Sequence, residues 1–270
     1  MMRWLLYAAS GLVALAGFQF FVLTEQTATT FAWTVQSFLT AASLGAAYWS
    51  AVPVEFLAAR ERTWANARIA VPGVWTFTTL TLILTAVHAS LFHFTSADAV
   101  PRAAAYLWLG IYAGVPVAML VALFLQTRKR GRDPPGQDRL PSALRFALLI
   151  EGTGTLVVGL ALFVIPDAMR PLWPWSLTTL TARAIGAWLV GIAVLQLQAF
   201  RENEFSRIRP MGAGIAVFGV LELIALARYP SEMAWSTPGA WLYLIFLASL
   251  LSVGVVVCLG AERFKSPSRP

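Results

Sequence analysis

Long apolar blocks separated by short polar breaks dominate the pattern of this chain. Several blocks reach the roughly 20 residues needed to cross the hydrocarbon core of a bilayer. The breaks hold charges, prolines and small polar residues, most densely over residues 128–141. We therefore predict an all-α, polytopic membrane protein with eight transmembrane helices, near residues 4–23, 31–52, 72–92, 103–126, 143–165, 177–199, 211–228 and 239–260.

Composition supports this interpretation. Apolar residues make up 58% of the 270 positions and charged residues only 12%, whereas a soluble domain averages about 45–50% and about 25%. So few charges could not cover a water-facing surface. Cys258 is the chain's single cysteine, which excludes an intrachain disulfide and a cysteine metal cluster. We expect the first apolar block to be a retained helix and not a cleaved signal peptide.

Once the eight helices are assigned, lysine and arginine are concentrated on one side of the membrane. Sixteen of the 20 fall in the N-terminal segment, in alternate breaks and in the C-terminal segment. The other breaks hold only Arg102, Arg170 and Arg228, and Arg183 lies inside a predicted helix. Because cytoplasmic loops carry the excess of basic residues, we expect both termini in the cytoplasm. The net charge of +7 is spread over every inner loop, which favours anionic lipid as its neighbour and not nucleic acid.

The two halves of the chain resemble each other. A constant offset of 141 residues relates several short motifs, and an offset of 142 relates others near the start of each half. We predict two tandem four-helix repeats of the same orientation, residues 1–127 and 142–261, joined by a basic, Pro/Gly-rich cytoplasmic linker (128–141) and followed by a cytoplasmic tail (262–270). The motifs at the offset of 141 are Leu39-Thr40-Ala41 and Leu180-Thr181-Ala182, Gly45-Ala46 and Gly186-Ala187, and Arg60-Glu61 and Arg201-Glu202.

Three ionisable residues lie well inside predicted helices and are the candidate binding residues: Glu151, Arg183 and Glu222. A charge at the centre of a membrane helix costs about 2.5–3.5 kcal/mol on insertion scales, so each needs a partner or water. Arg183 and Glu222 lie at similar depth, and both have uncharged counterparts in the first half. We therefore predict an Arg183–Glu222 salt bridge. Glu151 lies deeper, in a small and polar stretch that could line a cavity.

Other chemistry is weakly represented. The two histidines, His88 and His93, are five residues apart and would point in different directions from one helix, so we read them as interfacial polar residues. We find no catalytic constellation and no phosphate-binding glycine loop. We therefore predict no catalytic residue, no metal site and no cofactor.

Three segments resemble a group of uncharacterised bacterial polytopic membrane proteins. They are the stretch Phe31-Ala32-Trp33-Thr34, the pair Leu39-Thr40-Ala41 and Leu180-Thr181-Ala182, and the loop Ala59-Arg60-Glu61-Arg62. The resemblance covers most of the chain. It implies a multi-pass protein of the bacterial inner membrane and implies no activity.

Two main classes of function remain open. The first is a small transporter or permease, with the intramembrane charges near a pathway between the halves. The alternative is a non-catalytic subunit or assembly factor of a larger membrane complex, which would have other membrane proteins as partners. We rank an intramembrane enzyme last, because nucleophiles, bases and ligands do not cluster.

Overall fold

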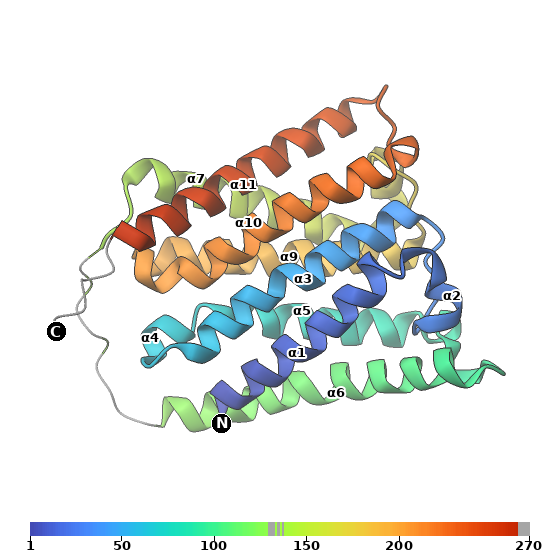
Figure 1. The fold of residues 1–270 in the computed structure, drawn as a ribbon, viewed down its shortest axis with the longest axis horizontal. Coiled ribbons are helices and arrows are strands. Elements are labelled where there is room, and N and C mark those ends of the chain that lie inside the picture. The colour runs from blue at the N-terminus through green and yellow to red at the C-terminus, as the bar shows by residue number, and fades with distance from the viewer. Residues whose placement is uncertain (129–132, 134–135, 137, 264–270) are drawn as a thin grey trace.

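The structure of the chain is a computed structural model that describes residues 1–128, 133, 136 and 138–263. Within this part, long helices run side by side along one common direction (Figure 1). They are α1 (Met2–Phe21), α3 (Phe38–Arg60), α5 (Ala70–Val87), α6 (Ala99–Thr127), α7 (Ser142–Val164), α9 (Thr179–Glu202), α10 (Phe205–Arg228) and α11 (Pro238–Arg263). The all-α prediction is confirmed.

Short helical turns occupy the connections between the long helices. They are η1 (Thr24–Gln26), α2 (Thr27–Thr30), α4 (Trp64–Ala67), η2 (Ala89–Leu91), η3 (His93–Thr95), α8 (Pro166–Met169), η4 (Arg170–Leu172) and η5 (Pro230–Glu232). Such turns keep the connections compact, because they satisfy backbone groups beyond the ends of the long helices.

Seven segments of the described chain are long and apolar enough to cross a membrane: Met2–Phe21, Trp64–Val87, Ala99–Thr127, Ser142–Val164, Thr179–Glu202, Phe205–Arg228 and Pro238–Glu262. These lengths and compositions are those of a multi-pass membrane protein. Helix α3 is as long as the others but is not one of the seven. Sixteen of its 23 residues are buried, and a helix shielded from lipid by its neighbours does not need a uniformly apolar sequence.

Several expected helix boundaries are wrong. The second helix begins at Phe38 and not at residue 31, because residues 31–37 lie outside the helix and Trp33 pairs with Phe92 in an isolated β-bridge. The same helix continues through Pro53 to Arg60, eight residues beyond its expected end. The third helix ends at Val87, five residues early.

The long helices pack most extensively in five pairs. Within the first half, α1 lies along α3, and within the second half α7 lies along α9 and α10 along α11. Between the halves, α3 packs on α10 and α5 packs on α9. Helix α9 is the most enclosed of the seven apolar segments, with 83% of its central window buried.

Glycines mark the closest approaches, and these recur at the predicted offset. A Cβ at Gly45 would come within 2.5 Å of the Phe21 backbone nitrogen on α1, and a Cβ at Gly186 within 2.9 Å of the Phe163 nitrogen on α7. Such small residues let two helix backbones approach in lipid. Between the halves, a Cβ at Gly73 would contact Gly191 O at 3.0 Å, and one at Gly214 would contact Ser50 O at 2.9 Å.

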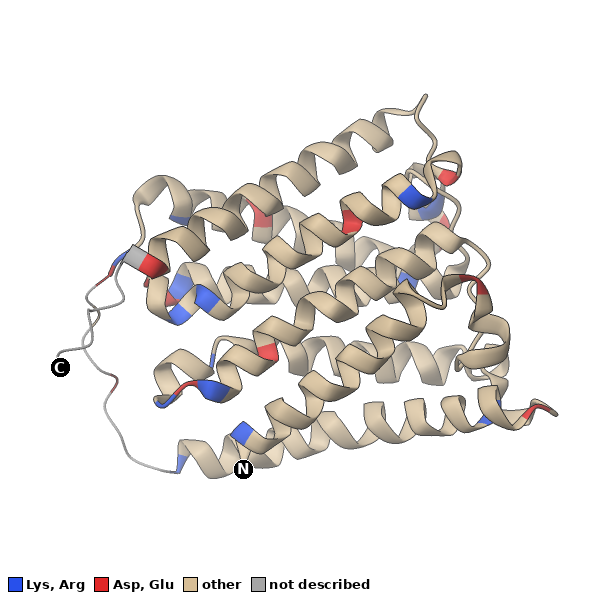
Figure 2. Ribbon diagram, viewed as in Figure 1, with Lys and Arg blue, Asp and Glu red and all other residues tan. Residues whose placement is uncertain are grey.

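Charged side chains gather at the two ends of the bundle, and most of the basic ones lie at the end where α1 begins (Figure 2). At this end, Arg68 pairs with Glu202 and with Asp133, each at 2.6 Å. The pairing joins the α4–α5 connection of the first half to the end of α9. The expected linker and tail lie partly outside the described residues, at 129–132, 134–135, 137 and 264–270.

Candidate functional site

Glu55 is a buried carboxyl group that the sequence analysis did not single out. It lies on α3, two turns after Tyr48 and therefore on the same helical face. Only 2% of Glu55 is exposed, and its Oε2 atom has no hydrogen-bond partner in the described part of the chain. Buried polar atoms without a partner are rare in folded proteins, so each one needs an explanation.

Glu55 was missed because the expected helix ended at residue 52, before Pro53. The apolar pattern in fact resumes directly after Pro53 with Val54, Phe56 and Leu57. A second signal was also present, because the offset of 141 carries Glu55 onto Gln196. Polar side chains at equivalent positions of two otherwise apolar helices would have indicated a polar site at this depth of the bundle.

A cavity of about 100 Å³ lies beside Glu55. Its lining comes from α1, α3, α5 and α6 of the first half and from α9 and α10 of the second, so it lies at the junction of the halves. Apart from Glu55, the lining side chains are mostly aliphatic and aromatic. Its polar groups include the hydroxyls of Tyr48 and Tyr112, which are 2.6 Å apart in one hydrogen bond.

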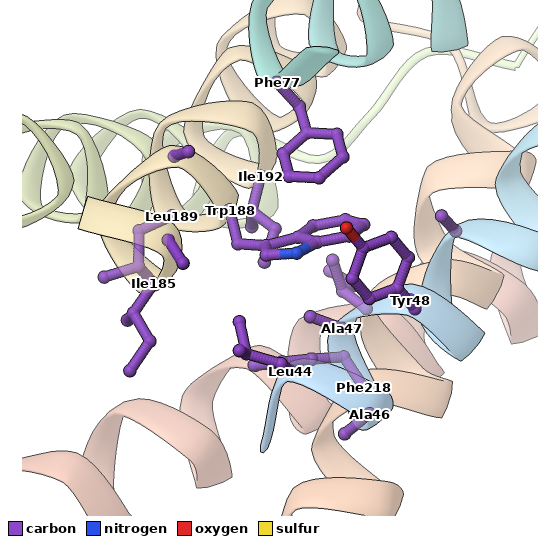
Figure 3. Close-up of a cluster of buried hydrophobic side chains, with 14 of the residues drawn as sticks. Leu44, Ala46, Ala47, Tyr48, Phe77, Ile185, Trp188, Leu189, Ile192 and Phe218 are labelled. Carbon is purple, nitrogen blue, oxygen red and sulfur yellow. The ribbon is translucent and has the colours of Figure 1, made fainter. Parts of the chain in front are cut away.

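Trp188 forms one wall of this cavity and comes from the second half. Its ring lies 3.8 Å from the Phe77 ring and 4.9 Å from the Tyr48 ring, measured between centroids. Figure 3 shows Trp188 reaching from α9 into the space between Phe77 and Tyr48, with Leu44 and Phe218 below them. Aromatic faces from both halves therefore surround the cavity.

Glu151 lines a second and larger cavity, of about 320 Å³. Its lining comes entirely from the second half: α7, α9, α11 and the connection from Met169 to Pro174. Both carboxylate oxygens of Glu151 have donors, because Gln196 donates to Oε2 at 2.8 Å and Ser249 donates to Oε1. The expectation that Glu151 could line a cavity is confirmed, but this cavity does not lie between the halves.

The two cavities occupy corresponding places under the predicted offsets. At an offset of 142, α1 residues of the first cavity correspond to α7 residues of the second: Ala9 to Glu151, Leu12 to Gly154, Val13 to Thr155 and Ala16 to Val158. Glu55 corresponds to Gln196, the residue that binds Glu151. Each half thus holds one carboxyl group at a similar place, supplied by a different helix.

The predicted Arg183–Glu222 salt bridge is wrong. Arg183 donates from Nε to Phe163 O at 3.0 Å and from Nη1 to His88 Nε2 at 2.7 Å, so it faces α7 and the end of α5. Glu222 is 1% exposed and accepts from Ser43 of α3 at 3.0 Å and from the Tyr243 hydroxyl of α11. The two residues therefore contact different neighbours.

Both histidines make local polar contacts near the ends of helices. His88 accepts from Arg183, and His93 contacts Thr34 Oγ1 at 3.2 Å and Phe31 O at 2.9 Å. Among the described residues, no group of three or more His, Cys, Asp or Glu side chains is placed to hold a metal ion.

Comparisons of the chain with protein-family models, with curated proteins and with solved structures gave no match.

Proposed function

We propose that the chain is a small transporter or permease of the bacterial inner membrane. In this proposal it has eight spans, both termini are cytoplasmic, and the halves are tandem repeats related by a pseudo-two-fold axis along the membrane normal. The recurrence of the Gly45 and Gly186 contacts, and of the Gly73 and Gly214 contacts, supports the repeats. The clustering of basic side chains at one end of the bundle supports the orientation.

One observation carries the transport proposal. Glu55 lines a cavity at the junction of the halves, and its buried Oε2 atom has no hydrogen-bond partner among the described residues. An ionisable group inside the membrane is costly and usually marks a substrate or ion pathway. In transporters built from repeats, substrate sites lie where the repeats meet. Glu55 therefore takes the central role, while Glu151, Arg183 and Glu222 remain predicted binding residues.

The experiment is uptake by proteoliposomes that contain the purified full chain. Vesicles with an imposed pH gradient are offered a defined mixture of small organic solutes, and mass spectrometry measures what accumulates inside. Accumulation by the wild type that is lost in Glu55→Gln, and retained in a control such as Gly110→Ala on the outer face of α6, supports transport. Equal accumulation in wild-type, Glu55→Gln and protein-free vesicles would contradict it.

One feature favours the alternative of a subunit or assembly factor. Gly110 and Gly114 lie four residues apart on the exposed face of α6, and a Cβ at either would meet nothing within 4 Å. This spacing allows close approach of another transmembrane helix. Gentle solubilisation from native membranes followed by native mass spectrometry tests this: a stoichiometric partner that is lost on Gly110→Ile supports the subunit role.

A further inference from the structure

The buried carboxyl groups of this chain differ in how well their oxygens are satisfied. Glu151 and Glu222 each accept two hydrogen bonds. Glu202 lies between Arg68 and Arg207. Only Glu55, of these four, keeps a buried oxygen without any partner among the described residues. A satisfied carboxyl group has a structural explanation, whereas Glu55 calls for a donor that none of the described residues supplies.

The cavity beside Glu55 defines what kind of donor would fit. The rings of Tyr48, Phe77, Trp108 and Trp188 line it, and the remaining lining is largely aliphatic. No lysine, arginine or histidine is among its lining residues. Aromatic faces attract cations, and a carboxylate pairs with an ammonium group through a charge-assisted hydrogen bond. An anionic ligand would find no basic partner in this lining, and a bare metal ion would lack the several oxygen ligands that it prefers.

The position of the cavity indicates the route of entry. On one side its wall is formed by α1 residues Leu12, Val13 and Ala16 and by α6 residues Ile111 and Val115, all of which are partly exposed. Helix α1 packs extensively on α3 and only sparsely on α6. This sparsely packed wall between α1 and α6 consists of apolar side chains, so an apolar molecule entering from the bilayer would cross no polar barrier there.

We propose that the Glu55 cavity binds a lipophilic amine in its protonated form, entering from the bilayer between α1 and α6. As a substrate assignment this rests on the proposed function, but the binding step can be measured without transport. An ionised carboxylate without a partner is expensive to bury, so the empty site holds Glu55 as the neutral acid. Binding of R–NH₃⁺ transfers the acid proton to water and leaves a carboxylate–ammonium pair, so one proton is released for each amine bound.

The titratable groups that face Glu55 from the packed elements are few. They are the hydroxyls of Tyr48 on α3 and Tyr112 on α6, which are bonded to each other. The lining segments of α1, α5, α9 and α10 contribute no ionisable side chain. The released proton therefore comes from Glu55, and affinity for the amine falls as the pH is lowered.

The test is isothermal titration calorimetry on the purified full chain in detergent, with empty micelles subtracted. The probe is cyclopentylamine, a small apolar ring with one ammonium group that suits a cavity of about 100 Å³, and cyclopentanol is its neutral counterpart. We expect the amine to bind at least tenfold more tightly than the alcohol. Titration in two buffers of different ionisation enthalpy should report about one proton released per amine.

Matched variants separate the site from general partitioning. Glu55→Gln should weaken amine binding at least tenfold and leave alcohol binding unchanged, while Asp167→Asn, which removes the charge of an exposed carboxyl group outside the cavity, should leave amine binding unchanged. If Glu55→Gln fails to fold, Glu55→Asp should keep the preference for the amine. Equal affinity of the wild type for amine and alcohol, or full amine affinity in Glu55→Gln, would overturn the proposal. Amine binding without uptake by proteoliposomes would refute transport and leave the binding site standing.

Discussion

The seam between α7 and α9 gives a prediction whose magnitude follows from the backbone geometry. A Cβ added at Gly186 would lie 2.7 Å from Gly159 O and 2.9 Å from the Phe163 nitrogen, where ordinary contacts begin at about 3.4 Å. Both neighbours are backbone atoms, so no flexible side chain can move aside. We therefore expect Gly186→Ala to push the two helices apart and to destabilise the protein.

The size of the effect can be separated from helix propensity. Overpacking of this kind costs about 1–3 kcal/mol, while alanine gains about 1 kcal/mol over glycine inside a helix. Gly110→Ala supplies the matched control, because its Cβ meets nothing within 4 Å. The difference between the two variants isolates the packing cost. For a chain of this length it corresponds to an apparent Tm about 2–12 °C lower for Gly186→Ala than for Gly110→Ala.

The single cysteine provides the assay. Cys258 is partly buried in α11, so a thiol-reactive fluorogenic maleimide reports unfolding in detergent as the temperature rises. Gly159→Ala should behave like Gly186→Ala, because its Cβ would meet Leu189 and Val190 across the same seam. A Gly186→Ala protein that unfolds at or above the temperature of Gly110→Ala would refute the close packing of α7 and α9.

Three further predictions test the other contacts. Glu222→Gln should leave the apparent Tm nearly unchanged. Glu222→Leu should lower the free energy of unfolding by about 1–3 kcal/mol, because the Ser43 and Tyr243 hydroxyls are left buried without an acceptor. Equal losses in the two variants would contradict this. Arg68→Ala should cost about 1.5–3 kcal/mol because Glu202 is 3% exposed. By contrast, Arg209→Ala should cost less than about 1 kcal/mol because its pair with Glu262 is more exposed. In a Cys258→Ser background, an impermeant maleimide should label Thr29→Cys on intact cells and Arg62→Cys only after permeabilisation. Labelling of both positions from one side would show that α3 does not span the membrane.

The all-α fold and the positions of most long helices could be predicted from the spacing of apolar blocks. The errors came where local composition and tertiary context disagree. The second helix was expected to end at residue 52, although α3 continues through Pro53 to Arg60. The apolar stretch that begins at Phe31 was read as helix, although part of it is extended and pairs with Phe92. Neither outcome can be inferred from hydropathy alone.

The site was harder to predict because sequence gives depth along a helix but not direction around the bundle. Arg183 and Glu222 were placed at similar depth, which suggested a pair. Their partners are instead set by the neighbours of α9 and α10: the Phe163 carbonyl for the first and Ser43 for the second. For the same reason, the sequence could not show that the Glu55 Oε2 atom has no hydrogen-bond partner among the described residues. That property depends on how six helices pack around Glu55.

The crossed packing of α3 on α10 and of α5 on α9 means that neither half is a self-contained unit. Residues 1–127 expressed alone would expose the faces of α3 and α5 that the second half covers, and a second copy could cover them in the same way. If the tandem repeats proposed above arose by duplication, these contacts predict an ancestor that was an interlocked homodimer of four-helix subunits. Fusion of two such subunits would remove the requirement for strict symmetry, in keeping with Glu55 in one half and Gln196 at the equivalent position of the other.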